Sequence, residues 1–159
     1  MEIKFWLNGR KIQTQIQADT LLLDLLREKE CYSVKRGCET ANCGLCTVLV
    51  EDKPVLSCSM LAARVEEKHV VTLEGLQEKA EELGGFLARE GAEQCGFCNP
   101  GFIMNVFAML EEMKEPTEEE IGEYLAGNLC RCSGFMGQTR SILAFLKYKK
   151  EQREGGSDR

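Results

Sequence analysis

The chain has 159 residues, which is enough for one ordinary domain or two small ones. Its hydrophobic content of 43% can form a core, whereas a net charge of −6 without a basic patch argues against binding to nucleic acid. No apolar run approaches the roughly 18–20 residues of a membrane span, and the N-terminal residues lack the pattern of a secretory signal. We therefore expect a cytoplasmic protein whose nine cysteines are metal ligands or reactive thiols rather than disulfides.

The first residues predict a hairpin followed by a helix. Apolar residues alternate over 3–7 and again over 12–16, as in strands with one buried face. The dipeptide Asn8-Gly9 between them favours a two-residue hairpin turn. A short helix is expected over Leu21–Glu28.

Three further strands complete the first half. Thr47–Val50 and Val55–Cys58 predict a second hairpin that turns at Asp52-Lys53-Pro54, and Val70–Leu73 predicts one more strand. Short strands around one helix indicate a small α+β domain, and we place its boundaries at residues 1–75.

The second half predicts helices. Helical periodicity covers Leu76–Glu90, and a second helix is expected after Asn99, with Asn99 as its N-cap and Pro100 at the first position. Thr117 with Glu120 three residues later is the pattern of a capping box and predicts a third helix that ends near residue 127.

A fourth helix is expected over Gln138–Lys150. Four helices with short connections indicate a bundle, with predicted boundaries at residues 76–150. The last residues, Glu151–Arg159, are polar and are expected to form a frayed tail.

Eight of the nine cysteines fall into two sets of four. The first set has the C-x4-C-x2-C spacing and distant fourth cysteine of plant-type ferredoxins, which bind a 2Fe–2S cluster. Its members are Cys38, Cys43, Cys46 and Cys58. Gly37 and Gly44 allow the loop to wrap closely around a cluster. A structural zinc site or buried free cysteines are the alternatives.

The second set combines C-x2-C with C-x-C and is less specific. Its members are Cys95, Cys98, Cys130 and Cys132. Each pair lies in a connection between predicted helices, and the two connections meet at one end of an antiparallel bundle. Spacing alone leaves both an iron–sulfur cluster and a four-thiolate zinc ion open.

The remaining candidates have ordinary explanations. Cys31 lies outside both sets and is expected to be a small, half-buried residue. His69, the only histidine, is expected to be structural. Arg131 lies between two predicted ligands, where it either offsets cluster charge or faces solvent or a partner. The sequence contains no dinucleotide-binding loop, P-loop or serine-protease-like set.

Three segments carry a resemblance to a known family. They cover residues 37–48, 94–101 and 127–134 and read GCETANCGLCTV, QCGFCNPG and GNLCRCSG. In this order they closely resemble the small iron–sulfur subunit of the molybdenum hydroxylases, the family of xanthine dehydrogenase and aldehyde oxidoreductase. The resemblance covers roughly residues 1–150 and implies a 2Fe–2S cluster in the second set as well.

The resemblance implies an N-terminal plant-ferredoxin-like β-grasp domain and a C-terminal four-helix bundle, each with one 2Fe–2S cluster. It implies a large partner subunit that binds molybdenum through a molybdopterin, and a medium partner that binds FAD. Electrons then pass from molybdenum to the bundle cluster, to the β-grasp cluster and to FAD. Gln94 and Cys132 are expected to lie against the pterin.

Three positions depart from the family pattern. Asn99 replaces a threonine, Leu45 replaces a small residue between the cysteines, and Phe135 replaces a tyrosine. The hydroxyl of that tyrosine, and any hydrogen bond it makes in relatives, is therefore missing.

The sequence thus predicts the electron-relay subunit of a hetero-oligomeric oxidoreductase, such as a heterotrimer or a dimer of heterotrimers, without turnover of its own. The substrate is expected to be a purine or another N-heterocycle. Aldehydes, carbon monoxide and aromatic acyl-CoA compounds are alternatives. A free-standing ferredoxin-like carrier and a zinc-stapled interaction module are the competing functions.

Overall fold

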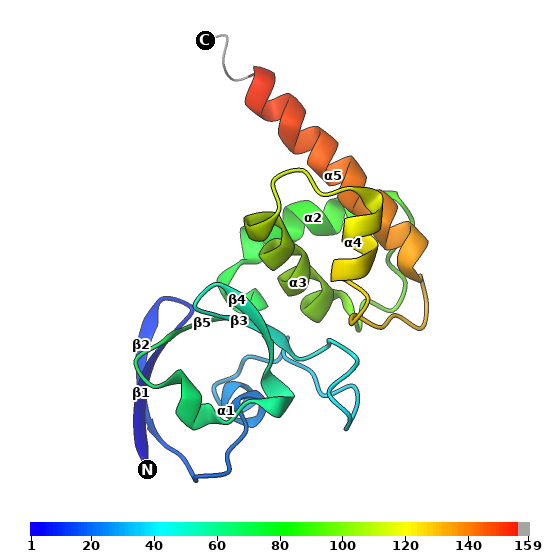
Figure 1. Ribbon diagram of the computed structural model, residues 1–159. Helices are drawn as coiled ribbons and strands as arrows, with labels where there is room; N and C mark the ends of the chain where they lie inside the picture. Colours follow the sequence, from blue (N-terminus) through cyan, green and yellow to red (C-terminus); the bar gives the residue numbers. More distant parts are fainter. Residues whose placement is uncertain (156–159) are drawn as a thin grey trace.

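The computed structural model describes residues 1–155 and contains a small sheet domain joined to a helical domain (Figure 1). The sheet has five strands in the order β2-β1-β5-β3-β4. Strands β1 and β5 run parallel, and every other neighbouring pair is antiparallel. The strands are β1 (Glu2–Leu7), β2 (Arg10–Gln15), β3 (Thr47–Val50), β4 (Lys53–Leu56) and β5 (His69–Val71).

The two hairpins turn at different kinds of residues. Asn8 and Gly9 have φ angles of 50° and 79°, as the predicted tight turn requires. The second turn is not at Asp52-Lys53-Pro54, because Glu51 and Asp52 are the residues with positive φ. Strand β4 therefore begins at Lys53 and includes Pro54, which an edge strand tolerates. The prediction of a strand over 55–58 was wrong by two residues, since Ser57–Ser59 forms a single 3-10 turn.

Helix α1 (Leu22–Glu28) packs under the curved sheet, which wraps around it as in a β-grasp (Figure 1). Its four buried leucines contact the inward residues of β1 and β3 in one apolar core. The α+β class predicted for this half is confirmed. Two more 3-10 turns follow, Ala62–Val65 and Leu73–Gly75. The last of them leads out of the sheet domain, and the boundary at residue 75 stays a prediction.

Four helices form the second domain, and each contributes to one apolar core. They are α2 (Gln77–Arg89), α3 (Asn99–Glu112), α4 (Glu118–Tyr124) and α5 (Phe135–Gly155). The capping box at the start of α4 is confirmed, because Thr117 Oγ1 accepts a hydrogen bond from Glu120 N and the Glu120 carboxylate accepts one from Thr117 N.

Helices α3, α4 and α5 differ from the prediction at one or both ends. Asn99 is not the N-cap of α3 but its first residue, with Cys98 at the cap and no side-chain cap bond. Helix α4 ends at Tyr124, before the predicted stop. Helix α5 begins three residues early, and residues 151–155 continue it rather than form a tail, because most of these residues favour helix and Gln152 bonds to the Tyr148 hydroxyl one turn back. Residues 156–159 of the predicted tail lie outside the described residues.

The two domains pack directly on each other. All four residues of β3 are buried, because one face of the strand meets α1 and the other meets α3. Leu49 of β3 contacts Met104 and Ala108 of α3 in a small core of its own. Among residues 1–155 no helix is both long and apolar enough to cross a bilayer.

Candidate metal centres

The first cysteine set is gathered by a loop and a 3-10 turn. Cys43 and Cys46 are buried in the loop before β3, whereas Cys38 and Cys58 are half-buried. Both the amide N–H and the hydroxyl of Ser57 donate to the Cys46 carbonyl, over 3.3 and 2.7 Å. These bonds hold the turn that carries Cys58 next to the loop, so that four thiols converge on one place.

Backbone amides make this place suitable for an anionic group. The N–H groups of Asn42, Thr40 and Cys43 and the Cys43 thiol point at the Cys38 sulfur and lower its pKa to about 6. Burial raises the pKa of Cys58, and the neighbouring sulfurs of the other three cysteines raise it further. The thiols are therefore close enough to influence one another, and backbone amides face Cys38 and Cys43, as amides face the sulfurs of iron–sulfur sites.

A Cβ on either glycine of this loop would meet a close neighbour. A Cβ on Gly37 would lie 2.7 Å from Leu45 Cδ2 and 3.2 Å from Cys43 Sγ. Gly44 has a φ of 73°, and a Cβ there would lie 2.5 Å from Asn128 Nδ2. The loop can therefore pass tightly around its cysteines, and at Gly44 it also passes tightly against the bundle.

The second set meets at one end of the bundle, as the helix order predicted. The sulfurs of Cys95 and Cys132 are 3.5 Å apart. The thiols of Cys98 and Cys130 also contact each other, and this contact, after burial, helps to raise the pKa of Cys98 to about 11. Ser133 N donates to Cys130 Sγ over 3.3 Å. The set thus forms two thiol pairs, and each pair joins one cysteine from each helix connection.

The donor sets fit 2Fe–2S clusters, which take four thiolates, two on each iron. Metal binding would remove the thiol protons, and the amides at Cys38 and Cys130 favour the charged form. Among residues 1–155 no three or more His, Cys, Asp or Glu side chains lie close enough together to hold one metal ion between them.

Of the candidates outside the two sets, Cys31 and His69 have structural roles. Cys31 is buried, more fully than expected, and burial raises its pKa. His69 stacks on Trp6 with ring centroids 4.9 Å apart, as a structural histidine does. Arg131 is exposed.

Three polar residues of the site were missed by sequence reasoning. Gln138 is 2% exposed, and its Nε2 lies 4.0 Å from Cys98 Sγ. Asn128 is 4% exposed, accepts a hydrogen bond from Asn105 and faces the Gly44 carbonyl. Lys35 contacts Phe97 across the domain junction. Of the three, only Asn128 could have been suspected from the sequence, since it lies within GNLCRCSG, one of the segments that carry the family resemblance.

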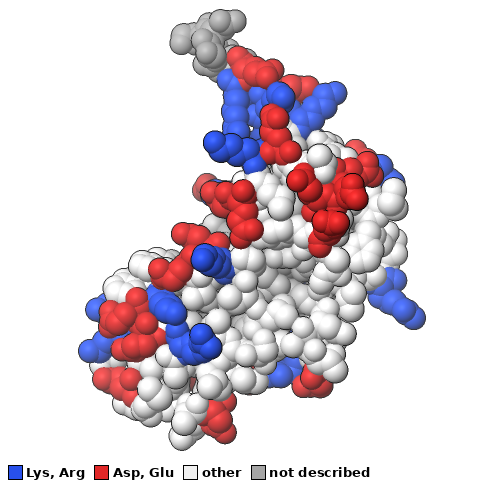
Figure 2. Space-filling view, in the orientation of Figure 1, with Lys and Arg blue, Asp and Glu red and all other residues white. Residues whose placement is uncertain are grey.

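Exposed apolar side chains surround the second set. They come from three separate loops or helix starts and are Phe97, Leu129, Phe135 and Met136, exposed by 51%, 48%, 44% and 65%. Cys95, Cys132 and Gln94 are exposed in the same region. Figure 2 shows few charged side chains across the middle of the molecule, where the sheet domain meets the bundle. We call the four apolar residues the apolar rim.

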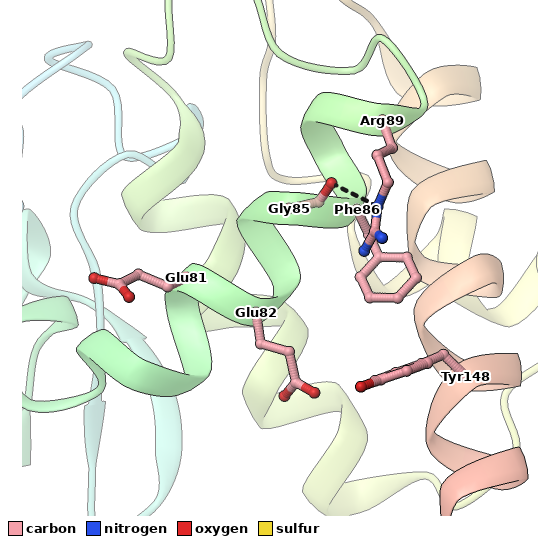
Figure 3. A pocket seen from close by; sticks show the side chains of 6 residues that line it. All are labelled: Glu81, Glu82, Gly85, Phe86, Arg89 and Tyr148. Carbon is pink, nitrogen blue, oxygen red and sulfur yellow. Dashed lines mark hydrogen bonds between the residues drawn. The ribbon is translucent and has the colours of Figure 1, made fainter.

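Two hollows lie elsewhere. A hollow of about 500 Å³ between α2 and α5 is lined by carboxylates, Phe86, Arg89 and Tyr148, and Arg89 donates to the Gly85 carbonyl there (Figure 3). A larger one of about 1450 Å³ lies between β3, α3 and the end of α5. Neither of these two hollows is lined by a cysteine.

Comparison with known proteins agrees with this geometry. Residues 5–73 match the 2Fe–2S iron–sulfur cluster binding domain, and residues 72–143 match the [2Fe–2S] binding domain. The chain is 43% identical to the xanthine dehydrogenase iron–sulfur-binding subunit of Escherichia coli O157:H7, over 92% of this chain and 95% of that one. It is 41% identical to the nicotinate dehydrogenase small FeS subunit of Eubacterium barkeri, over 92% of both.

The chain belongs to the small iron–sulfur subunits of the molybdenum hydroxylases. Quinoline 2-oxidoreductase from Pseudomonas putida 86 contains a chain of the same fold, with a TM-score of 0.86, 34% identity and coverage of 95% of this chain and 96% of that one. Aldehyde oxidoreductase from Desulfovibrio gigas matches with a TM-score of 0.87 and 28% identity over 96% of this chain, which spans 17% of that protein.

This small iron–sulfur subunit therefore has two 2Fe–2S-binding domains and serves electron transfer within an oxidoreductase. The four-helix bundle and the plant-ferredoxin-like domain expected from the resemblance are confirmed. The zinc-stapled module is not supported, because both halves match iron–sulfur domains.

Proposed function

We propose that each cysteine set holds one 2Fe–2S cluster through its four thiolates. The β-grasp cluster is held by Cys38, Cys43, Cys46 and Cys58, and the bundle cluster by Cys95, Cys98, Cys130 and Cys132. When bound, each cluster accepts and donates one electron. The convergence of the thiols and the amides that face Cys38 and Cys130 support this assignment.

We further propose that the bundle docks on a large partner subunit that holds molybdopterin. The observation that carries this step is the apolar rim, since four large apolar side chains exposed around one site are typical of an interaction surface. Gln94 and Cys132 are both exposed beside the rim, and we place them against the pterin. Among the residues proposed as pterin contacts, Gln94 offers an amide that can both donate and accept hydrogen bonds.

The electron route follows from this docking. Electrons enter at the bundle cluster, pass to the β-grasp cluster and leave to FAD on a medium partner subunit. The direct contact between the two cysteine loops supports transfer within the chain, because Leu129 N donates to the Cys43 carbonyl over 2.9 Å. A free-standing carrier would have no use for an apolar rim around its second site.

The substrate that we propose for the assembled enzyme is an N-heterocycle. Relatives that cover nearly the whole chain are named for xanthine, nicotinate and nicotine, and the structure at 34% identity for quinoline. The aldehyde oxidoreductase structure, at 28% identity, is the basis for the alternative. A heterotrimer, or a dimer of heterotrimers, in the cytoplasm is the assembly we expect.

Metal analysis and spectroscopy test this function. The purified complex should contain about four irons and four acid-labile sulfides for each copy of this chain, at two of each per cluster. Low-temperature EPR of the reduced protein should give two distinct 2Fe–2S signals, and substrate should reduce both. Zinc in place of iron, one cluster only, or a chain that is active as a free monomer would contradict the proposal.

A further inference from the structure

Lys35 lies between the two cysteine loops and contacts both. Its amide N–H donates to the carbonyl of Leu45, inside the loop of the β-grasp cysteines, over 3.4 Å. Its ammonium Nζ donates to the carbonyl of Phe97, between the bundle cysteines Cys95 and Cys98, over 3.1 Å. The Lys35 side chain thus joins the β-grasp loop, which its backbone contacts, to Phe97, 62 residues further along the sequence.

The same ammonium group lies over the Phe97 ring. Nζ is 4.6 Å from the ring centroid, within the range of a cation–π contact. The ring is 51% exposed, so the lysine covers one side of an otherwise open aromatic group. Two contacts to one residue fix where the charge lies, directly beside the C-x2-C segment.

This charge is not used in an ion pair. Within the described part of the chain no carboxylate lies within 4.0 Å of Lys35 Nζ. The next residue provides a contrast, because Arg36 pairs with Asp24 over 2.7 Å and with Glu39 over 3.7 Å. The Lys35 charge therefore acts on its surroundings without being offset by a close carboxylate.

We propose that Lys35 is a positioning residue that holds the Cys95–Cys98 segment against the β-grasp loop and raises the reduction potential of the bundle cluster. Reduction adds one electron, and hence one negative charge, to the cluster. A fixed positive charge nearby stabilises the reduced form more than the oxidised form, and net charge around a cluster is one of the factors that set its potential. The inference does not depend on the direction in which electrons travel through the chain.

Three variants separate charge, length and background effects. Lys35→Met removes the charge but keeps a long apolar side chain, and Lys35→Arg keeps the charge. Lys11→Met is the matched control, because Lys11 also lies over an aromatic ring, 5.2 Å from that of Trp6, but on strand β2, which carries no cysteine. All are made in the full chain and purified with its partner subunits.

The midpoint potentials of both clusters are measured by redox titration followed by EPR. We expect Lys35→Met to shift the bundle cluster to a more negative potential, with a smaller shift at the β-grasp cluster. Lys35→Arg should restore the wild-type potential, and high salt should reduce the shift, since it screens the charge. An unchanged potential with both clusters present, or an equal shift in Lys11→Met, would overturn the electrostatic role.

Hydrogen exchange of the amides in residues 94–98 tests the positioning role. We expect faster exchange in Lys35→Met than in wild type or Lys11→Met, because the Phe97 carbonyl loses its partner. The measurement is made on the metal-free chain as well as on the loaded protein, so it remains decisive if the variant takes up less iron. Equal exchange in all variants would overturn the positioning role.

Discussion

Leu129 N donates a hydrogen bond to the carbonyl of Cys43 over 2.9 Å, and this bond joins the two cysteine loops. Cys43 is a proposed ligand of the β-grasp cluster, and Leu129 directly precedes Cys130, a proposed ligand of the bundle cluster. Gly44, next to Cys43, lies just as close to the bundle, because its carbonyl faces both Asn128 and Gly101. These contacts at Cys43 and Gly44 therefore hold the two cysteine loops together, in addition to the side-chain contact of Lys35 with Phe97.

Gly101→Ala should force these loops apart. A Cβ on Gly101 would lie 2.2 Å from the Gly44 carbonyl oxygen and 2.9 Å from Leu45 Cα, and backbone cannot move aside cheaply. We expect a loss of about 1–3 kcal/mol or more in the free energy of unfolding, and a weaker magnetic interaction between the reduced clusters. Thermal unfolding and EPR measure the two effects.

Gly122→Ala is the control for that substitution. Gly122 lies in α4, and a Cβ there meets no atom within 4 Å. Alanine in an exposed helix is favoured over glycine by up to about 1 kcal/mol, so this variant should be neutral or more stable. Equal stability of the two variants would show that the Gly101 contact does not hold the domains together.

Gln138→Leu should change stability and potential in opposite directions. The Gln138 side chain is buried, and its Oε1 has no hydrogen-bond partner within residues 1–155, which costs about 1–3 kcal/mol. Its Nε2 faces Cys98 Sγ, and hydrogen bonds to cluster sulfurs raise the potential. Leucine should therefore leave the melting temperature unchanged or raised, while the potential of the bundle cluster becomes more negative. A lowered melting temperature with an unchanged potential would refute this account.

Glu74→Gln should loosen the connection between the domains. The Glu74 carboxylate accepts hydrogen bonds from Ser33 N and Ser33 Oγ over 2.8 and 2.6 Å and from Thr72 Oγ1 over 2.6 Å. Burial raises the pKa of Glu74, but these bonds outweigh burial and hold the pKa below the ordinary 4.5. We expect the free energy of unfolding to fall by about 1 kcal/mol, a small loss because the carboxylate is partly exposed.

The pH dependence of that loss has a definite sign. A carboxyl group whose pKa is lowered by folding stabilises the protein above its unfolded pKa, and the effect is lost as pH falls through the folded pKa. The difference in melting temperature between wild type and Glu74→Gln should therefore be constant between about pH 6 and 8 and should shrink only below about pH 4.5. A difference that changes between pH 6 and 8 would contradict the assignment.

Cys58→Ser should remove the β-grasp cluster while the bundle cluster remains. The turn that carries Cys58 contacts the β-grasp loop, and the bundle ligands come from a separate part of the chain. Iron should fall from about four to about two per chain, with one EPR signal lost. Cys31→Ala, at the buried cysteine outside both sets, should keep both signals. Loss of both signals in a folded Cys58→Ser protein would contradict independent ligand sets.

The sequence predicted those features that depend on neighbouring residues. The spacing of the cysteines, the Asn8-Gly9 turn and the capping box at Thr117 are local patterns, and the structure confirms the turn and the capping box. The turn at Glu51-Asp52 was missed because glutamate, unlike aspartate, seldom adopts positive φ, so the pairing of β3 and β4 must impose it at Glu51.

The features that the sequence did not predict depend on contacts between residues far apart in the chain. Lys35 and Phe97 are separated by 62 residues, and Gln138 lies 40 residues from Cys98. Nothing near Lys35 or Gln138 in the sequence distinguishes them from any other surface lysine or helix glutamine. The role of Lys35 follows only from the packing of the bundle on the sheet domain, and that of Gln138 only from the packing of α5 against the start of α3.

Gln94→Ala should slow electron entry without removing either cluster. Gln94 precedes Cys95, is exposed beside the apolar rim and is not a member of either thiol set. If its amide bonds to the pterin, the loss of that bond costs about 0.5–1.5 kcal/mol, which corresponds to a rate lowered several-fold rather than abolished. Stopped-flow reduction of the clusters by substrate in the assembled complex measures the rate.

Gln13→Ala provides the matched control, since Gln13 is also exposed but lies on β2, away from the cysteines. Both variants should retain wild-type iron content and both EPR signals, so that a change in rate cannot come from a missing cluster. A slower rate in Gln94→Ala alone places its amide on the path of electrons from molybdenum. Equal rates in both variants, with intact clusters, would show that the pterin contact belongs to another residue of this face.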